Sequence, residues 1–455
     1  MRGLTWTAAI WVIALVALAP HGWRSFFRTG KLGYSRAQWA IVLVLLGSHS
    51  FAGAATADEV LANPVVIERV LRGVLDVMAL LIAAPVLYQK VRSGRTMRSP
   101  GLTALVLYGA IAAISALYSI AAIVTVGKAM ELAAALTAVC LMATGPNPRD
   151  EFRSTVRLVV LLEAALVLVA VIGFFLLPGA FHSGDTRPGF ITAASMGSPF
   201  SHPNALSASG ALIVVYAIAS FFGSVTRRAK AGWATAALFG TVAILLASGR
   251  QGLVIWVVAV AVLLWVHRRS LLLLFIGPSA ALIIWSNWGL IWGAVTRDQA
   301  AINVTTWSGR LTWWSSALKT AAAHPLTGFG YGAGGRWAAL QRIGEDMASS
   351  VHNGYLEVLL GVGIIGAVFL LIPVVRVAIW SFRNLAAKHD TPIAILIVPL
   401  LLHTFVSLGF GGWVNADLIL LACLIGISDV DHLRASPMKT RQIAPVPPSV
   451  VEQSQ

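Results

Sequence analysis

The residues best suited to chemistry in water lie in one polar stretch, 308–366, between long apolar runs. It contains Arg310, His324, a glycine-rich bend at 328–335, Arg336, Arg342 and the triplet Val351-His352-Asn353. Guanidinium groups bind phosphate oxygens, and a histidine can take a proton from a hydroxyl near neutral pH. The pattern predicts a site that displaces a pyrophosphate leaving group.

Arg310 begins a segment with helical periodicity, because Leu311, Trp314, Leu318 and Ala321 fall on one face. Such a helix should lie on the membrane surface with that face down. Arg310 would then stand at the helix N-terminus, where backbone N–H groups also favour an anion. An arginine that binds lipid headgroups is the alternative.

His352 and Asn353 precede an apolar run that starts near Tyr355. Asn353 is a plausible N-cap for that helix, and His352 is a candidate base for an attacking hydroxyl. A histidine that only bonds loop carbonyls is the alternative. Asn353 and Arg336 are candidate substrate-binding residues.

The glycine-rich bend contains a formal GxGxxG at Gly330, Gly332 and Gly335. It follows no predicted strand, so we reject a dinucleotide site. The glycines are expected to permit a tight backbone path over the substrate.

Further cations lie outside this stretch. Arg250 stands between two apolar runs, where a charged side chain costs free energy. Such a residue is a functional candidate by default. An ordinary arginine of a short loop is the alternative. Arg187 is another cation on the same side. Asn204 is a candidate substrate-binding residue, and Asn204 or Ser201 can also simply cap the helix that follows.

The sequence predicts neither a metal nor a cofactor. Asp298, Glu345 and Asp346 lack a convincing ligand arrangement. Cys140 and Cys423 both lie in apolar runs and are expected to be packed thiols.

Composition places the chain in a membrane. It has 455 residues, of which 58% are hydrophobic and 11% charged, and its mean hydropathy is +0.80. Apolar runs long enough to cross a bilayer as helices recur along it, without the alternation of a β-barrel. We predict an all-α polytopic bundle with about twelve spans, at 37–55, 70–88, 101–124, 128–144, 155–178, 203–223, 233–248, 251–266, 270–286, 355–376, 392–408 and 413–428.

Charge sets the predicted orientation. The net charge is +15, but the Lys and Arg residues fall mostly in short loops, which favours the positive-inside rule over nucleic-acid binding. The basic loops are therefore expected in the cytoplasm. The loops near 58–68, 125–127, 179–202, 249–250, 287–354 and 409–412 are expected to face outward.

The predicted organisation has three parts. An N-terminal apolar segment and basic loop occupy 1–36, where 4–20 is an uncleaved segment or a thirteenth span. The bundle occupies 37–428, with a large outward helical loop at 287–354. The tail, 429–455, is expected to be disordered.

Charges inside the spans are expected to be structural. Arg72 and Asp76 are four residues apart on one helix, as an ion pair would be. Glu163, Glu357 and Asp417 are expected to find partners within the bundle, although a proton path is the alternative.

Four motifs resemble the O-antigen ligase/polymerase superfamily over residues 185–370. They are GSPFSHPNAL, LLASGRQGLVIW, GRLTWWSSALKTAAAHPLTGFGYG and SSVHNGYLEVLLGVGIIG. The last two, in this order and spacing, are the more specific. Asn353-Gly354-Tyr355 is closest in style to exopolysaccharide polymerases.

The resemblance implies an inverting, metal-independent transferase with a GT-C-like fold in the bacterial inner membrane and an active site facing the periplasm. Its donor would be a glycan on undecaprenyl pyrophosphate, held by Arg250 and Arg310. His352 would act as base or orient the acceptor, a glycan or lipid-glycan hydroxyl. Other polysaccharide export proteins are conceivable partners.

Two other function classes stay open at this point. A GT-C transferase that uses a monophosphate-linked sugar would place acids in the first outward loop, where Asp58 and Glu59 stand. A non-enzymatic flippase or transporter of lipid-linked sugars would depend on Glu131, Glu163 or Asp417.

Overall fold

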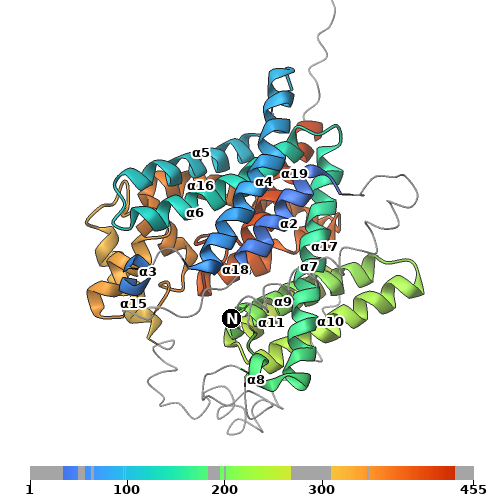
Figure 1. Cartoon of the computed structure of the whole chain (residues 1–455). Coiled ribbons are helices and arrows are strands. Elements are labelled where there is room, and N and C mark those ends of the chain that lie inside the picture. The colour runs from blue at the N-terminus through green and yellow to red at the C-terminus, as the bar shows by residue number, and fades with distance from the viewer. Residues whose placement is uncertain are drawn as a thin grey trace, which may run out of the picture.

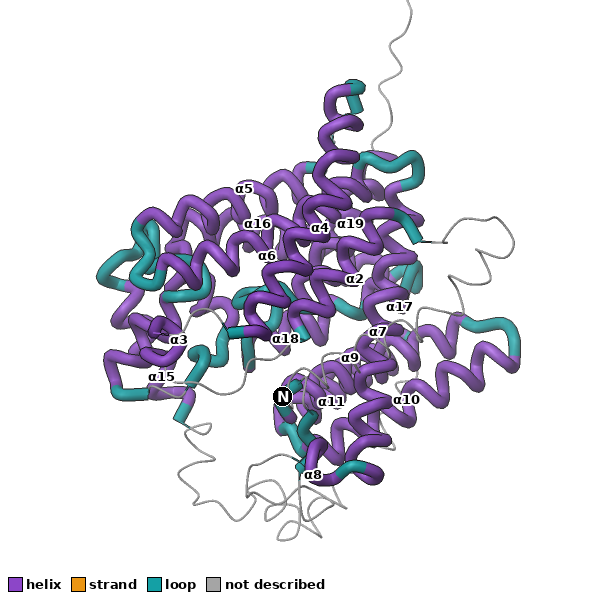
Figure 2. The backbone as a smooth tube through the Cα atoms, viewed as in Figure 1, coloured by secondary structure: helices purple, strands orange, loops and turns teal. Residues whose placement is uncertain are grey.

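The chain is a bundle of helices in a computed structural model that describes residues 34–49, 57–62, 66–95, 97, 99–182, 195–198, 201–267, 309–345 and 348–435. No β-sheet occurs among these residues (Figure 2). The main helices of Figure 1 are α2 (Arg36–Ser48), α3 (Ala57–Ala62), α4 (Ile67–Arg92), α5 (Pro100–Ile114), α6 (Ala122–Ala143), α7 (Pro148–Leu176), α8 (Pro178–Phe181), α9 (Pro203–Gly223), α10 (Arg227–Ala247), α11 (Arg250–Val266), α15 (Arg310–Ala321), α16 (Gly354–Ala386), α17 (Thr391–Ala394), α18 (Ile397–Val406) and α19 (Ala416–Ala435).

Seven of the described helices are long and apolar enough to cross a membrane, which confirms a polytopic helical membrane protein. They are α4, α5 with its following turn, α6, α7, α9, α10 and α16. The apolar helices Arg36–Ser48, Arg250–Val266 and Thr391–Val406 are shorter. The predicted span 270–286 and the segment 4–20 lie outside the described residues.

The boundary predicted between the third and fourth spans is wrong. A 3₁₀ turn, Ser115–Leu117, ends α5, and α6 begins at Ala122, so the turn lies at 118–121 and not at 125–127. Ser119 fixes it, because its hydroxyl accepts the Ala121 N–H at 3.1 Å and bonds the Thr125 hydroxyl at 2.7 Å.

Loops gather at the two ends of the bundle as the charge pattern predicts. At the basic end, Arg149 and Arg153 pair with Asp390, and Arg149 also pairs with Asp431. At the other end, the Ile120 N–H donates to Phe329 at 3.2 Å, and Arg310 donates to Val406 at 2.7 Å.

The predicted boundary of the tail falls inside a helix. α19 continues to Ala435, and Asp429 accepts the N–H of Gly101 at 2.8 Å. Asp431 pairs with Arg149 at 2.7 Å. These two carboxylates therefore join the basic end of the bundle together. Residues 436–455 lie outside the described part.

Charges within the bundle are paired between helices. Arg72 of α4 pairs with Glu131 of α6, not with Asp76 as the i,i+4 spacing predicts. Lys128 also reaches Glu131 at 3.2 Å, and its ammonium lies 4.6 Å from the ring centre of Trp413. The buried carboxylate of Glu131 needs cationic partners, and this explains why Arg72 pairs with it rather than with Asp76.

The predicted partners of the other acids are present. Glu163 of α7 bonds His49 at 3.0 Å and accepts the Ser209 hydroxyl at 2.8 Å. Glu357 accepts the N–H of Val351 at 2.7 Å. Buried carboxylates with such partners are typical of structural groups in membrane bundles.

Helix α16, which packs along α5 (Figure 1), is broken at Gly363, whose φ of 65° and ψ of −169° are not helical. The break releases two carbonyls and two N–H groups, and the segment 325–330, which leads into the glycine-rich bend, bonds all four. Phe329 and Gly330 donate to the Leu360 and Gly361 carbonyls at 2.7 and 2.9 Å. Ile364 and Ile365 donate to the Pro325 and Leu326 carbonyls at 2.8 and 3.3 Å.

The bend is therefore bonded into the break in α16, and a path of its glycines over a substrate stays a prediction. A Cβ at Gly330 would lie 2.1 Å from the Ser119 hydroxyl, and one at Gly334 would lie 2.3 Å from the Leu360 carbonyl oxygen. Glycine is needed here because backbone approaches protein on both sides.

Candidate active site

Four helices begin around the candidate site. The N-caps are His202 for α9, Gly249 for α11, Gly309 for α15 and Asn353 for α16. The N-terminus of a helix carries partial positive charge and points N–H groups outward. Neither glycine has a side chain that could accept those N–H groups. The arrangement favours an anion.

Arg310 is the first residue of α15 and is largely buried. Its Nη1 donates to the Val406 carbonyl at the end of α18, at 2.7 Å. Burial lowers the pKa of Arg310, and the nearby Arg250 lowers it further. The two guanidinium groups predicted to hold one leaving group are thus brought together, and an anion between them would offset their repulsion.

Arg250 is positioned by a close contact between α9 and the corner that joins α10 to α11. A Cβ at Gly249 would lie 2.0 Å from the Ser207 hydroxyl, and Ser248 before it has a φ of 55°. The Gln251 side chain donates to the Asn204 carbonyl at 2.9 Å. These contacts fix the first turn of α11 against the start of α9.

His352 is held by the tryptophans of α15. Its ring stacks on Trp313 with centroids 5.7 Å apart and planes 23° apart. The Trp314 indole N–H donates to the neighbouring Val351 carbonyl at 2.9 Å. His352 has a φ of 50°, a conformation that non-glycine residues seldom adopt. Its Nδ1 is buried without a hydrogen-bond partner among the described residues.

Burial lowers the pKa of His352 to about 3, with further lowering by Arg310, His202 and His403. Desolvation and neighbouring positive charge both disfavour the imidazolium. His352 is therefore neutral at physiological pH and can accept a hydrogen bond. Arg310, at the start of α15, is among the basic groups near the ring.

The remaining predicted residues divide into three groups. Asn353 is the N-cap of α16, because its side-chain oxygen accepts the N–H groups of Tyr355 and Leu356, both at 3.1 Å. Its part in substrate binding stays a prediction. Arg336 lies in a π-helix, Gly334–Leu340, where burial and Arg69 lower its pKa. Arg187 lies outside the described residues.

Asn204 lies at the site but does not cap α9. His202 is the cap, and its Nδ1 accepts the Asn204 N–H at 3.2 Å. Proline at the first helical position moves the cap back to His202, so the prediction of Asn204 or Ser201 as cap is wrong. Asn204 contributes its carbonyl to Ser207 and Gln251.

Two histidines at the site were not predicted from the sequence. One is His202, and the other is His403 of α18, whose Nδ1 lies 2.5 Å from an Asp417 carboxylate oxygen. A histidine within an apolar run such as 397–406 could have indicated a functional site, because ionisable groups in membrane helices are costly and are often functional. The partner of Asp417, which the sequence left unnamed, is His403.

Helix α15 also buries a face of small residues beside the apolar face that the sequence predicts to lie on the membrane. Ser316, Ala317, Thr320 and Ala321 are buried, whereas Leu311 is 47% and Leu318 56% exposed. Small residues pack against the π-helix, and the Ser316 hydroxyl donates to the Ala339 carbonyl at 2.7 Å. The exposed leucines remain available to a lipid surface.

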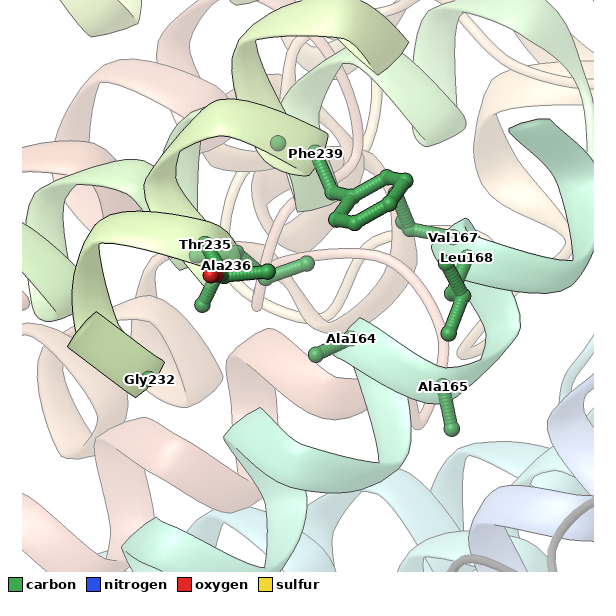
Figure 3. A pocket seen from close by; sticks show the side chains of 10 residues that line it. Ala164, Ala165, Val167, Leu168, Gly232, Thr235, Ala236 and Phe239 are labelled. Carbon is green, nitrogen blue, oxygen red and sulfur yellow. The ribbon is translucent and has the colours of Figure 1, made fainter. Parts of the chain in front are cut away.

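A separate apolar pocket lies between α7 and α10, as Figure 3 shows, with Ala164, Leu168, Ala236 and Phe239 in its wall. The Thr235 hydroxyl in that wall donates to its own helix at 3.0 Å. The wall of this pocket contains no ionisable side chain.

Residues 235–371 match the family model described as O-antigen ligase. This segment is an O-antigen ligase family domain. The match confirms the resemblance to the O-antigen ligase/polymerase superfamily and indicates an enzyme of glycosyl-transfer type. The domain runs from within α10 to within α16 and includes Arg250, Arg310 and His352, whereas His202, His403 and Asp417 lie outside it. No curated protein matches the chain.

Proposed function

We propose that the protein transfers or polymerises a glycan from an undecaprenyl-pyrophosphate donor onto a sugar hydroxyl at the periplasmic face of the inner membrane. The observation that supports this most is the meeting of Arg250, Arg310 and His352 among four helix N-termini. Two cations and several backbone donors suit a pyrophosphate, and the neutral ring suits a hydroxyl.

The reaction is a single displacement. The acceptor oxygen forms a bond to the anomeric carbon while the bond from that carbon to the pyrophosphate oxygen breaks, which inverts the configuration. Arg250 and Arg310 stabilise the negative charge that grows on the leaving group. The residues present provide this stabilisation with guanidinium groups and backbone N–H groups.

His352 accepts a hydrogen bond from the acceptor hydroxyl and so aims its oxygen. A pKa of about 3 makes this ring a poor store for the released proton. His403, whose Nδ1 lies 2.5 Å from an Asp417 carboxylate oxygen, has the arrangement of a histidine oriented by a carboxylate and is the other candidate to receive that proton. His352 is thus proposed to orient the acceptor and the His403–Asp417 pair to hold its proton.

The test is an Arg310→Ala variant in cells deleted for the native gene. We expect the variant to reach the membrane at wild-type level and to make no polymer, because the leaving group loses one of its two cations. Arg310→Lys should restore little, since an ammonium lacks the planar fork of a guanidinium. Lys319→Ala, an exposed cation on the same helix, serves as the control. Normal glycan from Arg310→Ala would refute the proposal.

Deletion also separates the two members of the reaction class. Surface glycan with single repeats marks a polymerase, whereas long lipid-linked chains that accumulate without transfer mark a ligase. The style of Asn353-Gly354-Tyr355 favours the polymerase outcome.

A further inference from the structure

A second pocket lies at the other end of α15 from the arginines. It is open and has a volume of about 510 Å³, which is within the range of roughly 300–1,000 Å³ for small-molecule sites. Its wall combines α15, the π-helix and the α5–α6 turn. The residues on which the argument depends are Ile120, Thr320, Phe329, Trp337, Gln341 and Arg342.

Thr320 carries a hydroxyl that the described part of the fold does not use. The residue is 4% exposed, and its Oγ1 has no hydrogen-bond partner among the described residues. Thr137 and Thr235 bond the carbonyl four residues back, at 2.7 and 3.0 Å, as helical threonines commonly do. A buried hydroxyl without a partner is destabilising, so a ligand in the pocket would give Thr320 its missing bond.

The rest of the wall is amphipathic. Ile120, Phe329 and Trp337 supply an apolar surface, while the amide of Gln341 and the guanidinium of Arg342 lie exposed at its edge. Gln341 already reaches Asp58 of α3 at 3.4 Å. A pyranose ring presents a C–H face that fits an aromatic side chain and hydroxyls that fit amides and hydroxyls. A phosphate would favour several cations, as around Arg250, but this wall has one.

We propose that this pocket binds one sugar unit of the glycan, at a distance from the bond that reacts. Thr320 and Arg310 are ten residues apart on one helix, which corresponds to about 15 Å along its axis. A chain of sugars whose reacting end lies at Arg310 could therefore reach the pocket along α15. The inference rests on the proposed function, because it names where the same substrate makes a second contact.

The experiment measures binding of free sugar to the full chain in lipid nanodiscs. The probe is the oligosaccharide released by mild acid from the lipid-linked glycan that accumulates in deletion cells. Thr320→Val removes only the hydroxyl, and Gln341→Ala alters an exposed side chain. Each should raise the Kd about tenfold, the effect of one lost hydrogen bond. Thr235→Val, whose hydroxyl is bonded within α10, should leave the Kd unchanged.

Arg310→Ala separates this inference from the proposed function. That variant should lose transfer but bind the free oligosaccharide as wild type does, because the probe has no pyrophosphate. If it kept transfer while Thr320→Val lost binding, the proposed chemistry would fail and the pocket would stand. Wild-type affinity in both Thr320→Val and Gln341→Ala would overturn the pocket, as would displacement of the sugar by equimolar inorganic phosphate.

Discussion

The pKa of His352 provides the sharpest test of the active-site geometry. Burial and three neighbouring basic groups lower it to about 3, against an ordinary value near 6.5. At pH 5 an ordinary histidine would be about 3% neutral, whereas one with a pKa of about 3 is almost wholly neutral. If the neutral ring orients the acceptor, His352 should contribute no acidic limb to the profile of kcat/KM between pH 7 and pH 5.

The assay is transfer from purified lipid-linked donor in nanodiscs over that pH range. The profile of kcat/KM is the correct one, because it reports groups of the free enzyme before an anion raises the pKa of His352. An acidic limb near pH 6.5 in the wild-type profile that is absent from the profile of the residual activity of His352→Asn would refute the buried, neutral ring.

The same shift makes stability depend on pH. The folded protein keeps His352 neutral, while the unfolded chain binds a proton near pH 6.5, so stability present at neutral pH is lost as the pH falls toward 3. One proton corresponds to about 1.4 kcal/mol per pH unit, or about 2 kcal/mol between pH 6 and 4.5. The apparent Tm of the wild type should therefore fall more steeply than that of His352→Asn. His432→Asn, at an exposed site on α19, should keep the wild-type slope.

Three further variants probe the scaffold. Gly363→Ala should lower the amount of folded protein in the membrane, since the Cβ of alanine would lie 2.2 Å from the Leu326 carbonyl oxygen. The backbone, with a φ of 65° and a ψ of −169°, is also in a region that costs a non-glycine residue about 1–3 kcal/mol. Glu131→Gln should lower the apparent Tm strongly, because Arg72 loses its partner and breaking a buried pair costs about 3–5 kcal/mol. Asn353→Ala should lower the apparent Tm slightly, by the loss of a cap worth about 1 kcal/mol.

Each of these variants has a matched control. Gly232→Ala adds a methyl group where nothing lies within 4 Å of the new Cβ, Asp150→Asn alters an exposed acid, and Asn147→Ala removes an N-cap that makes no side-chain bond. The structural reasoning is contradicted for any pair in which the control loses as much stability as its partner.

Local patterns in the sequence were sufficient for the elements and for much of the site. Hydrophobic runs predict helices that the structure confirms. The asparagine two residues before Tyr355, where an apolar run starts, correctly identifies Asn353 as the N-cap of α16. Charge, histidine and apolar flanks led to Arg310 and His352, which the structure places at the start of α15 and against Trp313, while their roles in the reaction stay predictions. Each of these signals is carried by neighbours in the chain, which is why it can be read there.

Contacts between distant segments could not be predicted in this way. Arg72 has one candidate partner four residues away and another on α6, and only the packed structure shows that it pairs with Glu131. The break in α16 has the same origin. Gly363 stands in an apolar run that favours helix. The segment around Leu326 supplies hydrogen bonds that replace those lost from the helix at the break.

That break connects the fold to the proposed chemistry. Arg310 and His352 lie at the two ends of the chain from α15 to α16, and the bend between them is bonded into α16 through Pro325 and Phe329. The first turns of α16 therefore take their direction from the bend, and α15 is fixed by the same segment on its other side. If α16 had no break, its own backbone would use the groups of residues 360–365 that now bond residues 325–330. Backbone hydrogen bonds thus fix the bend against α16, and the side chains of Trp313 and Trp314 then join the start of α15 to His352 and Val351.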